Sequence, residues 1–504
     1  MLLYIDPGTG GMLFTILIGL MGGVIYFFSS LFVKLKYSVG GGKKQDTKKV
    51  PLVFFCDHKR YWNTYEPILD ELERRGVKAL FLTMSEDDPF FKKEYQYISG
   101  EFIGTGNKAF SKLNLLNAGI VFSTTPGLDV LQWKRSRKAD YYIHIPHACS
   151  DITIYHMFGI DYFDAILLSG EYQIEQVREL ERLRNLPAKE LELVGVPYMD
   201  MMRERLECAE NLASNSAVSA ELSDSISMND STASEDLIVE EKNDIEGKPV
   251  EKTATDTKQR TILVAPSWGE SGLLSKYGEK LLDELLKTGY RIIVRPHPQS
   301  FTAEKELMDR LMKQYENTGL EWNRDNDNFN VLRSADLMIS DFSGVIFDYS
   351  LVFDKPFLYA ESKMDKAPYD CAWIEKELWV YDVLPRIGTK LCEEDFGRIK
   401  DVIDECITNP KGAEAREQAR RETWVHIGES SVRVADFIEK KLHELDYGKV
   451  GKEDINNKEL NEKDLSNCNK ELNKEQNNAQ TGEEHTKEGL TNTESGNVLG
   501  KEEA

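Results

Sequence analysis

Short apolar runs rich in β-branched and aromatic residues alternate with amphipathic helical patterns twice along this chain of 504 residues. Because parallel strands need crossover connections that are usually helices, this alternation predicts parallel sheets covered on both faces. The first set has predicted strands at Leu52–Cys56, Val77–Met84, Ile120–Ser123, Tyr141–Ile145, Ala165–Ser169 and Leu191–Val194, and helices at Thr64–Arg75 and Tyr172–Arg184. The second has strands at Thr261–Ala265, Arg291–Arg295, Leu337–Ser340 and Pro356–Tyr359, and helices near Lys276–Lys287, Ala303–Tyr315 and Val345–Leu351. We therefore expect an α/β protein with two doubly wound domains, whose ligand lies outside the carboxyl ends of the strands.

Two acidic segments interrupt and follow these patterns. Residues 207–258 carry a net charge of −9 and residues 449–504 a net charge of −5, which together make −14 of the chain's −23. Both are poor in aromatic residues and rich in Ser, Asn, Glu and Lys, so they bury too little apolar surface to offset chain entropy. We expect a disordered linker and a disordered tail, and no nucleic-acid partner.

The N-terminus predicts a membrane anchor. Met12–Val33 is a run of 22 residues without a charge, and a helix of that length spans about 33 Å, enough for a hydrocarbon core of about 30 Å. Six lysines follow within residues 34–49, and the positive-inside bias then places the rest of the chain in the cytoplasm. A re-entrant hairpin broken at Gly22 and Gly23 is the alternative.

These features divide the chain into five parts. We expect a membrane anchor with a basic juxtamembrane segment over residues 1–49, an N-terminal acceptor domain over 50–206, the acidic linker over 207–258, a C-terminal nucleotide-donor domain with a closing helix over 259–447, and the tail over 448–504. The seven cysteines are scattered and form no CxxC pair, so neither a disulfide framework nor a zinc site is indicated.

The segment VRPHP follows a predicted strand of the C-terminal domain, where doubly wound folds bind ligands. Pro296 and Pro298 fix their own φ near −65° and push the preceding residues toward extended conformations, so Arg295 and His297 are held in place. A guanidinium fork and an imidazole suit a phosphate. The alternative is a rigid turn with an incidental histidine.

A second phosphate signal lies in SADLMISDFSGVIFDYSLVFDKPFLY, residues 334–359, which predicts a strand, a tight turn, a helix and a strand. Ser343 and Gly344 stand at the predicted start of the helix, where free amides and the helix dipole favour an anion. The alternative is ordinary capping, because Asp341 and Ser343 are good N-caps. The two segments together favour an anion site.

The two segments resemble the C-terminal signature of the CDP-glycerol glycerophosphotransferase family, the teichoic acid primases and polymerases, which are membrane-associated enzymes of GT-B fold. The blocks APSWG (265–269) and HIGESSVRVADFI (426–438) are also similar to that family. In the N-terminal half IPHACSD (145–151), FDAILLSGEYQIEQV (163–177) and VGVPYMD (194–200) resemble its acceptor domain in order. The resemblance covers roughly residues 50–206 and 259–440.

The resemblance implies transfer of glycerol phosphate, or a similar polyol phosphate, from a CDP-activated donor to a lipid-linked acceptor in cell-wall polymer synthesis, with release of CMP. It implies that His147 is the general base and that His297 acts at the donor. The donor diphosphate or nucleotide would be bound by Arg295, Ser343, Gly344, Asp341, Ser267 and Trp268. An imidazole with a pKa near 6.5 can take a proton from an attacking hydroxyl.

Other interpretations stay open at this point. His144 and His156 could compete with His147 for the role of base. A UDP-sugar-dependent glycosyltransferase or epimerase could use the same fold and a similar diphosphate site, and a non-catalytic membrane scaffold is a third possibility. Asp325 and Asp327 match a DxD pattern but lie in a polar loop typical of a solvated turn, so we expect neither a metal nor a cofactor.

Overall fold

The computed structural model describes residues 49–227, 259–410 and 412–447. The predicted span Met12–Val33 and the predicted tail therefore lie outside the described residues. Over the described ranges, no helix is both long and apolar enough to cross a membrane.

The first sheet has seven parallel strands in the order β3-β2-β1-β4-β5-β6-β7. This order is doubly wound, with the reversal of strand order between β1 and β4. The strands are β1 (Val50–Cys56), β2 (Ala79–Thr83), β3 (Ile98–Phe102), β4 (Ala118–Ser123), β5 (Ala139–His144), β6 (Ala165–Leu168) and β7 (Glu190–Leu193). All six strands predicted in this half are confirmed. Strand β3 was missed because it lies at the edge and buries only Ile98.

The second sheet has six parallel strands in the order β10-β9-β8-β11-β12-β13, and here the reversal falls between β8 and β11. The strands are β8 (Thr261–Val264), β9 (Arg291–Val294), β10 (Glu321–Trp322), β11 (Leu337–Ser340), β12 (Phe357–Ala360) and β13 (Thr389–Leu391). The four predicted strands are confirmed. The two missed strands are edges of two and three residues, too short to leave a periodic pattern. Both domains are thus doubly wound α/β.

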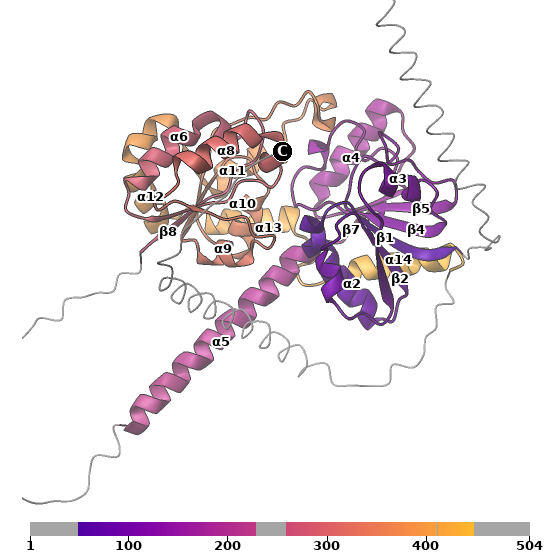
Figure 1. Cartoon of the computed structure of the whole chain (residues 1–504), viewed down its shortest axis with the longest axis horizontal. Coiled ribbons are helices and arrows are strands. Elements are labelled where there is room, and N and C mark those ends of the chain that lie inside the picture. The colour runs from indigo at the N-terminus through magenta and orange to yellow at the C-terminus, as the bar shows by residue number, and fades with distance from the viewer. Residues whose placement is uncertain (1–48, 228–258, 411, 448–504) are drawn as a thin grey trace, which may run out of the picture. The chain divides into compact units, whose positions relative to one another are not determined.

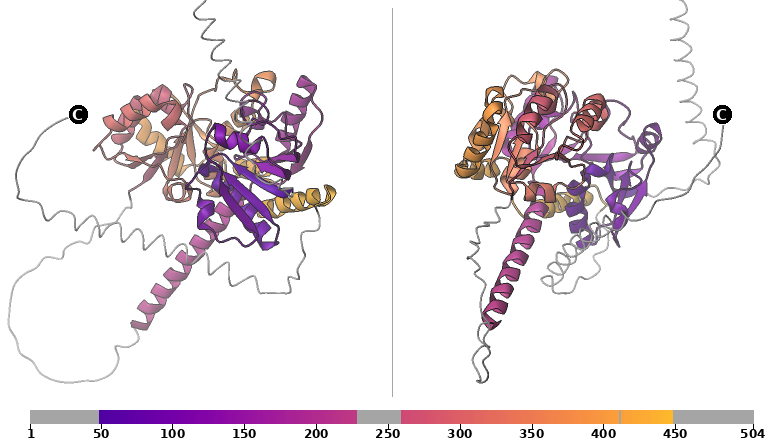
Figure 2. Two further views of the ribbon diagram at one scale, coloured as in Figure 1. Left: turned by 45° about the vertical axis from the view of Figure 1, so that its right-hand side comes forward. Right: turned by 60° about the vertical axis from the view of Figure 1, so that its left-hand side comes forward.

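Helices cover the sheets (Figures 1 and 2). In the first half they are α2 (Trp62–Arg74), α3 (Asn107–Leu113) and α4 (Glu171–Arg184), whereas α5 (Pro197–Ser227) begins beside the first domain and extends away from it. In the second half they are α6 (Leu273–Leu286), α7 (Ser300–Ala303), α8 (Lys305–Gln314), α9 (Phe329–Ser334), α10 (Val345–Phe347), α11 (Trp379–Ile387), α12 (Ile399–Thr408), α13 (Ala413–Thr423) and α14 (Ser430–Glu444). The helix predicted over Val345–Leu351 is α10 followed by a π-helical turn, Asp348–Val352.

Helix α5 changes the interpretation of the acidic linker. The helix continues from the N-terminal domain to Ser227, so the first part of the segment 207–258, predicted to be disordered, is helical. The prediction was based on net charge, whereas residues 201–222 also contain many Met, Leu, Ala and Glu, which are good helix formers. The remainder, 228–258, lies outside the described residues.

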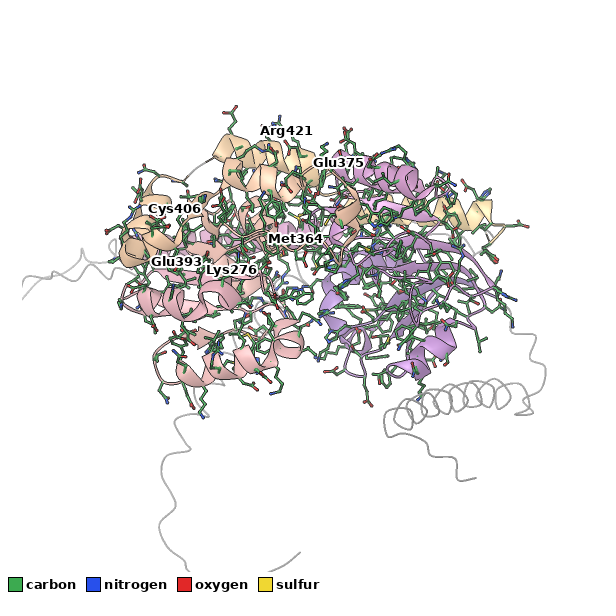
Figure 3. The ribbon with its side chains drawn as sticks, turned by 90° about the horizontal axis from the view of Figure 1, so that it is seen from above. Lys276, Met364, Glu375, Glu393, Cys406 and Arg421 are labelled. Carbon is green, nitrogen blue, oxygen red and sulfur yellow. The ribbon has the colours of Figure 1, made fainter. Side chains whose placement is uncertain are left out.

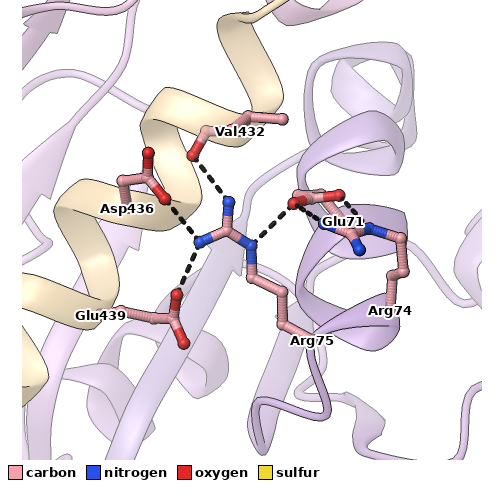
Figure 4. Close-up of polar contacts among 6 residues, drawn as sticks. All are labelled: Glu71, Arg74, Arg75, Val432, Asp436 and Glu439. Carbon is pink, nitrogen blue, oxygen red and sulfur yellow. Dashed lines mark hydrogen bonds and ion pairs between the residues drawn. The ribbon is translucent and has the colours of Figure 1, made fainter. Parts of the chain in front are cut away.

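Helix α14 belongs to the C-terminal half in sequence but packs on the N-terminal domain. Its buried residues Val434, Phe437 and Ile438 join the apolar cluster formed by β1, β4 and α2. Arg75, which follows α2, reinforces this contact (Figure 4): its guanidinium donates to Asp436 at 2.7 Å, to Glu439 at 2.6 Å and to the carbonyl of Val432 at 3.2 Å. The closing helix therefore completes the first domain, because its apolar face finds its partner there.

Candidate active site between the two sheets

A cleft of about 1830 Å³ is lined by residues that follow the carboxyl ends of strands from both sheets. Of the residues predicted from the sequence, the lining includes His147, Ser267, Trp268, Arg295, His297, Ser343 and Gly344. The elements meet where doubly wound sheets bind ligands, because Ser267 follows β8 and Ser343 follows β11, on either side of the reversal of strand order. Met364, labelled in Figure 3, also lines this cleft.

Asp341 does not line the cleft but organises its floor. Its carboxylate is fully buried and accepts hydrogen bonds from the amides of Ser267 at 2.9 Å, Leu273 at 2.8 Å and Ser343 at 3.1 Å. Burial raises the pKa of this carboxyl, and the three amides oppose the rise. The amides of Ser267 and Ser343 are therefore occupied by Asp341, and Asp341 positions the donor loops instead of contacting a ligand.

Other polar groups on the donor side remain available to a ligand. The hydroxyl of Ser267 is buried and has no hydrogen-bond partner among the described residues. The guanidinium of Arg295 donates to the side-chain oxygen of Asn323, and burial lowers its pKa. A cation and a serine hydroxyl at one end of the cleft suit an anionic ligand.

The ring of His297 is held in one orientation. The amide of Gln299 donates to Nδ1 at 3.1 Å, so in the neutral ring the proton is on Nε2. The imidazole lies 6.4 Å from the ring of Trp268, centroid to centroid. Burial lowers the pKa of His297 to about 3, with the positive charge of Arg60 adding to the shift. The ring is thus neutral at pH 7 and can donate a hydrogen bond from Nε2.

His147 follows β5 and faces the cleft from the N-terminal domain. Its ring lies 4.8 Å from that of Tyr61 and 6.0 Å from that of Tyr155. Its Nδ1 is buried without a hydrogen-bond partner among the described residues. Burial, with a further contribution from Arg60, lowers the pKa of His147 to about 4. A neutral imidazole with an unengaged nitrogen is able to accept a proton.

The two competing histidines are less suited to that role. His144 is fully buried and its Nδ1 lies 3.1 Å from the carbonyl oxygen of Ser123. It packs in the domain core and does not line the cleft. His156 lines the cleft but its ring is stacked on Tyr369 at 5.0 Å, and its Nδ1 lies 3.3 Å from the carbonyl oxygen of Pro368.

The donor loop and the His147 loop come into contact. A Cβ built on Gly344 would lie 3.5 Å from the Cβ of Ala148, an ordinary van der Waals distance. The structure therefore brings Gly344, beside the donor residues, next to the residue that follows His147. The two histidines predicted from distant parts of the sequence share one cavity.

Arg60 is a cleft residue that the sequence interpretation missed. Its guanidinium lies over the ring of Tyr61 at 4.8 Å and donates to Gln299 at 3.4 Å, while its Nε is buried without a partner among the described residues. The ring of Tyr61 faces that of His147, and the amide of Gln299 donates to His297. Because Arg60 contacts both Tyr61 and Gln299, it lies between the two histidines. The basic segment HKR (58–60), one residue after the end of β1, was the available signal.

Asp348 was also missed. This buried carboxyl accepts a hydrogen bond from Tyr198 at 2.6 Å and one from Asn328 at 3.3 Å. Burial raises its pKa to about 7, and the hydrogen bonds and the charge of Arg295 hold it from rising further. It lines the cleft from the π-helical turn. A single aspartate inside an apolar helical pattern gave no sign of this position.

Metal ligands are not gathered in the described part of the chain, where no group of three His, Cys, Asp or Glu side chains could hold a metal ion. Asp327 of the DxD pattern pairs with Arg205 at 2.7 Å, and Asp325 accepts from Asn323 at 2.7 Å. Asp327 therefore contacts helix α5, and Asp325 makes a contact within its own loop.

Comparisons with known proteins complete the description of this site. Residues 234–440 match the family model described as CDP-Glycerol:Poly(glycerophosphate) glycerophosphotransferase, which confirms the predicted family and the predicted class of enzyme, a transferase. No curated protein matches the chain.

Among solved structures, the wall teichoic acid polymerase TagF soaked with CDPG is similar, with 16% identity over 84% of this chain and 98% of that chain and a TM-score of 0.46. The UDP-GlcNAc 2-epimerase from Neisseria meningitidis bound to UDP-GlcNAc shows 11% identity over 78% of this chain and 100% of that chain, with a TM-score of 0.43. MurG of Acinetobacter baumannii shows 11% identity over 78% and 100%, with a TM-score of 0.37.

Proposed function

Because residues 234–440 belong to the CDP-glycerol:poly(glycerophosphate) glycerophosphotransferase family, we propose that the chain transfers glycerol phosphate, or a similar polyol phosphate, from a CDP-activated donor to a membrane-linked acceptor, and releases CMP. The acceptor would be part of a cell-wall or surface polymer. One observation carries the proposal: two neutral imidazoles from opposite domains face one cleft on either side of Arg60.

The reaction is a displacement at phosphorus. A hydroxyl oxygen of the acceptor attacks the β-phosphorus of the donor, the bond from that phosphorus to the oxygen bridging to CMP breaks, and a phosphodiester forms. His147 accepts the proton of the attacking hydroxyl, since its Nδ1 is unengaged and its ring is neutral. The departing CMP keeps the bridging oxygen and its electron pair.

The donor domain stabilises the leaving group. Arg295 and the hydroxyl of Ser267 would contact the diphosphate, and His297 would donate from Nε2 to a phosphate oxygen as negative charge moves onto CMP. Donors held in fixed orientations are worth more in the transition state than mobile ones, because they need no reorganisation. Trp268 offers an aromatic face near His297, and the Gly344 amide lies beside the same loop.

Arg60 would contact the phosphoryl group in transfer. A guanidinium between the two histidines can neutralise the developing charge on the equatorial oxygens. Burial, with a further contribution from the positive charge of Arg60, lowers the pKa of both histidines, so both rings are neutral at pH 7. Arg60 thus serves both steps, attack and departure.

The compartment is part of the same proposal. We place the chain in the cell membrane through the single span Met12–Val33, with the acceptor and donor domains in the cytoplasm, where a CDP-activated donor is made. The six lysines that follow the span support this orientation.

Acceptor-dependent CMP release tests the proposal. The purified full chain, in detergent, is incubated with CDP-glycerol with and without a lipid-linked acceptor, beside His147→Ala and His297→Ala. His156→Ala is the matched control, because this histidine lines the cleft but is stacked on Tyr369. We expect release that needs the acceptor, that both substitutions reduce by at least about 10²-fold, and that the control retains. Release from a UDP-sugar but not from CDP-glycerol would refute the proposal.

A further inference from the structure

The loop that carries His147 is buried where it leaves the cleft. Its residues 149–151 are at most 4% exposed. On the side of its own domain, the side-chain amide of Gln173 in α4 donates to the carbonyl of Ser150 at 2.6 Å. Helix α4 therefore fixes one side of the loop, and the other side faces the donor domain.

Helix α13 of the donor domain holds the loop two residues after His147 (α4, α11 and α13 are labelled in Figure 1). The hydroxyl of Thr423, the last residue of α13, donates to the carbonyl of Cys149 at 2.9 Å, and both residues are fully buried. The side chain of Cys149 belongs to the apolar cluster that includes Leu263 and Met338 of the donor sheet. The loop is thus embedded in the domain that does not contain it in sequence.

Asp151 makes a second contact with the donor domain. Its carboxylate accepts from the amides of Trp379 at 2.7 Å and Val380 at 3.0 Å, the first two residues of α11. The residue at the N-cap of α11 is Leu378, whose apolar side chain cannot accept from these amides. A carboxylate is favourable there, because it satisfies both amides and meets the positive end of the helix dipole. Asp151 therefore caps a helix of the opposite domain.

Helices α11 and α13 form one unit with the donor residues. Glu422 of α13 accepts a hydrogen bond from the indole of Trp379 in α11 at 2.9 Å. Helix α10 begins directly after Gly344, and its Phe347 ring lies 5.1 Å from the ring of Trp379. The elements that hold the His147 loop therefore also hold the segment that follows the donor turn.

We propose that Thr423 and Asp151 are positioning residues, through which the donor domain sets the place of His147 relative to the donor diphosphate. This inference rests on the proposed function, in which His147 accepts the proton of the attacking hydroxyl. Within the described part of the chain, neither residue lines the cleft, so both act through His147 and not by contact with a substrate.

The physical reason lies in the geometry of proton transfer. A base must stand within hydrogen-bond reach of the hydroxyl that it deprotonates, and a shift of about 1 Å in a reacting group can cost about 10²-fold in rate. The hydroxyl attacks a phosphorus bound by the donor domain. Contacts from that domain to the loop of His147 fix the distance from the base to the reacting atoms directly.

Steady-state kinetics of the full chain in detergent, with CDP-glycerol and a lipid-linked acceptor, tests this role. Thr423→Val removes the hydroxyl at nearly constant volume, whereas Thr423→Ser keeps it. Thr423→Val is expected to lower kcat by about 10- to 10²-fold and to leave the donor KM within about twofold of wild type, because the donor residues are untouched. Thr423→Ser should restore kcat. Asp151→Asn, which leaves one oxygen for two amides, should lower kcat in the same way.

The thiol of Cys149 reports on the loop without any turnover. It is fully buried, as is the thiol of Cys56 in the core of the same domain, so both should react slowly with N-ethylmaleimide. Thr423→Val and Asp151→Asn should speed the labelling of Cys149, followed by mass spectrometry, by at least about fivefold, because the loop opens more often. The labelling of Cys56 should stay unchanged, and Thr423→Ser should behave like the wild type.

Thr288→Val is the matched control. Thr288 is buried and its hydroxyl donates to the carbonyl of Leu285 at 2.6 Å, but it follows α6 near the amino end of β9, away from the cleft. This variant should keep the wild-type kcat and the wild-type labelling of Cys149.

The outcomes separate this inference from the proposed function. If the wild type is active and Thr423→Val has the kcat of Thr423→Ser, the positioning role is overturned. Labelling of Cys149 that neither Thr423→Val nor Asp151→Asn accelerates would overturn it as well. A wild-type chain that releases no CMP from CDP-glycerol would refute the proposed function, and the labelling would still decide whether the donor domain holds the loop.

Discussion

Replacing Asp341 by Asn tests whether this buried carboxylate holds the donor loops together. Its two oxygens accept from three amides that belong to three different segments: Ser267 after β8, Leu273 at the start of α6, and Ser343 after β11. Asparagine has nearly the same shape but presents one oxygen and one NH₂ group. One of the three backbone amides must then face the NH₂ group, which is itself a donor and cannot accept its hydrogen bond.

The magnitude follows from those contacts. If the asparagine oxygen keeps the amides of Ser267 and Ser343, the Leu273 amide is left unsatisfied in a buried site, which costs about 1–3 kcal/mol. The two remaining bonds change from charged to neutral acceptors, a loss of about 1 kcal/mol each. Relief from burying a charge offsets part of this. We expect a net destabilisation of about 2–4 kcal/mol and a raised KM for the donor.

Urea unfolding followed by tryptophan fluorescence measures the stability, and donor titration of CMP release measures KM. The control is Asp336→Asn at the amino end of β11, because among the described residues this carboxylate accepts from one backbone amide, that of Thr261 at 2.7 Å, and lies at the far end of the strand from the cleft. It should lose no more than about 1 kcal/mol, with an unchanged KM. Equal losses and equal KM values in the two variants would refute the role assigned to Asp341.

Three further predictions concern the cleft and the packing around it. Arg60→Ala should lower kcat/KM by about 10²–10³-fold and, by removing a charge that depresses the pKa of both cleft histidines, should move the acid limb of the pH profile to higher pH; an unmoved limb contradicts this. Burial lowers the pKa of His144 to about 3, so the unfolded chain binds a proton there that the native chain does not, and this residue should contribute about 1.4 kcal/mol to the fall in stability between pH 7.5 and 5.5; in urea titrations at each pH, His144→Phe should reduce the fall by that amount, while the share of His147 and His297 remains. Gly195→Ala should destabilise the protein by more than about 2 kcal/mol, because φ is +91° and the added Cβ would lie 2.3 Å from the carbonyl oxygen of Val425. Its control is Gly397→Ala, where the added Cβ would meet no non-neighbouring atom within 4 Å, so the melting temperature should change little.

The sequence predicted the sheets because their central strands are continuous apolar runs, as at Phe54 and Ile339, which are fully buried. Edge strands such as β10 have two residues and little burial, so no pattern marks them. The partner of α14 could not be predicted, because an amphipathic face specifies that a surface is buried but not which domain covers it.

The candidate site likewise contains residues whose role the sequence predicted and residues whose role it did not. Arg295 and His297 could be predicted because prolines fix their segment after a strand, and the structure places both in the cleft. The role of Asp341 could not be predicted, because an aspartate before a turn gives the same sequence pattern whether its carboxylate contacts a ligand or accepts from three backbone amides. Arg60 was missed because its position depends on Tyr61 and Gln299, which only the fold brings together.

Phosphorus NMR of the full reaction tests the central claim most directly. The full chain is mixed with CDP-glycerol and a lipid-linked acceptor, and the signals of the donor diphosphate are followed. We predict that they are replaced by the phosphomonoester signal of CMP and by a new phosphodiester, in equal amounts. Loss of the diphosphate to CMP and free glycerol phosphate, with no phosphodiester, would contradict transfer, as would an unchanged donor in the presence of active acceptor.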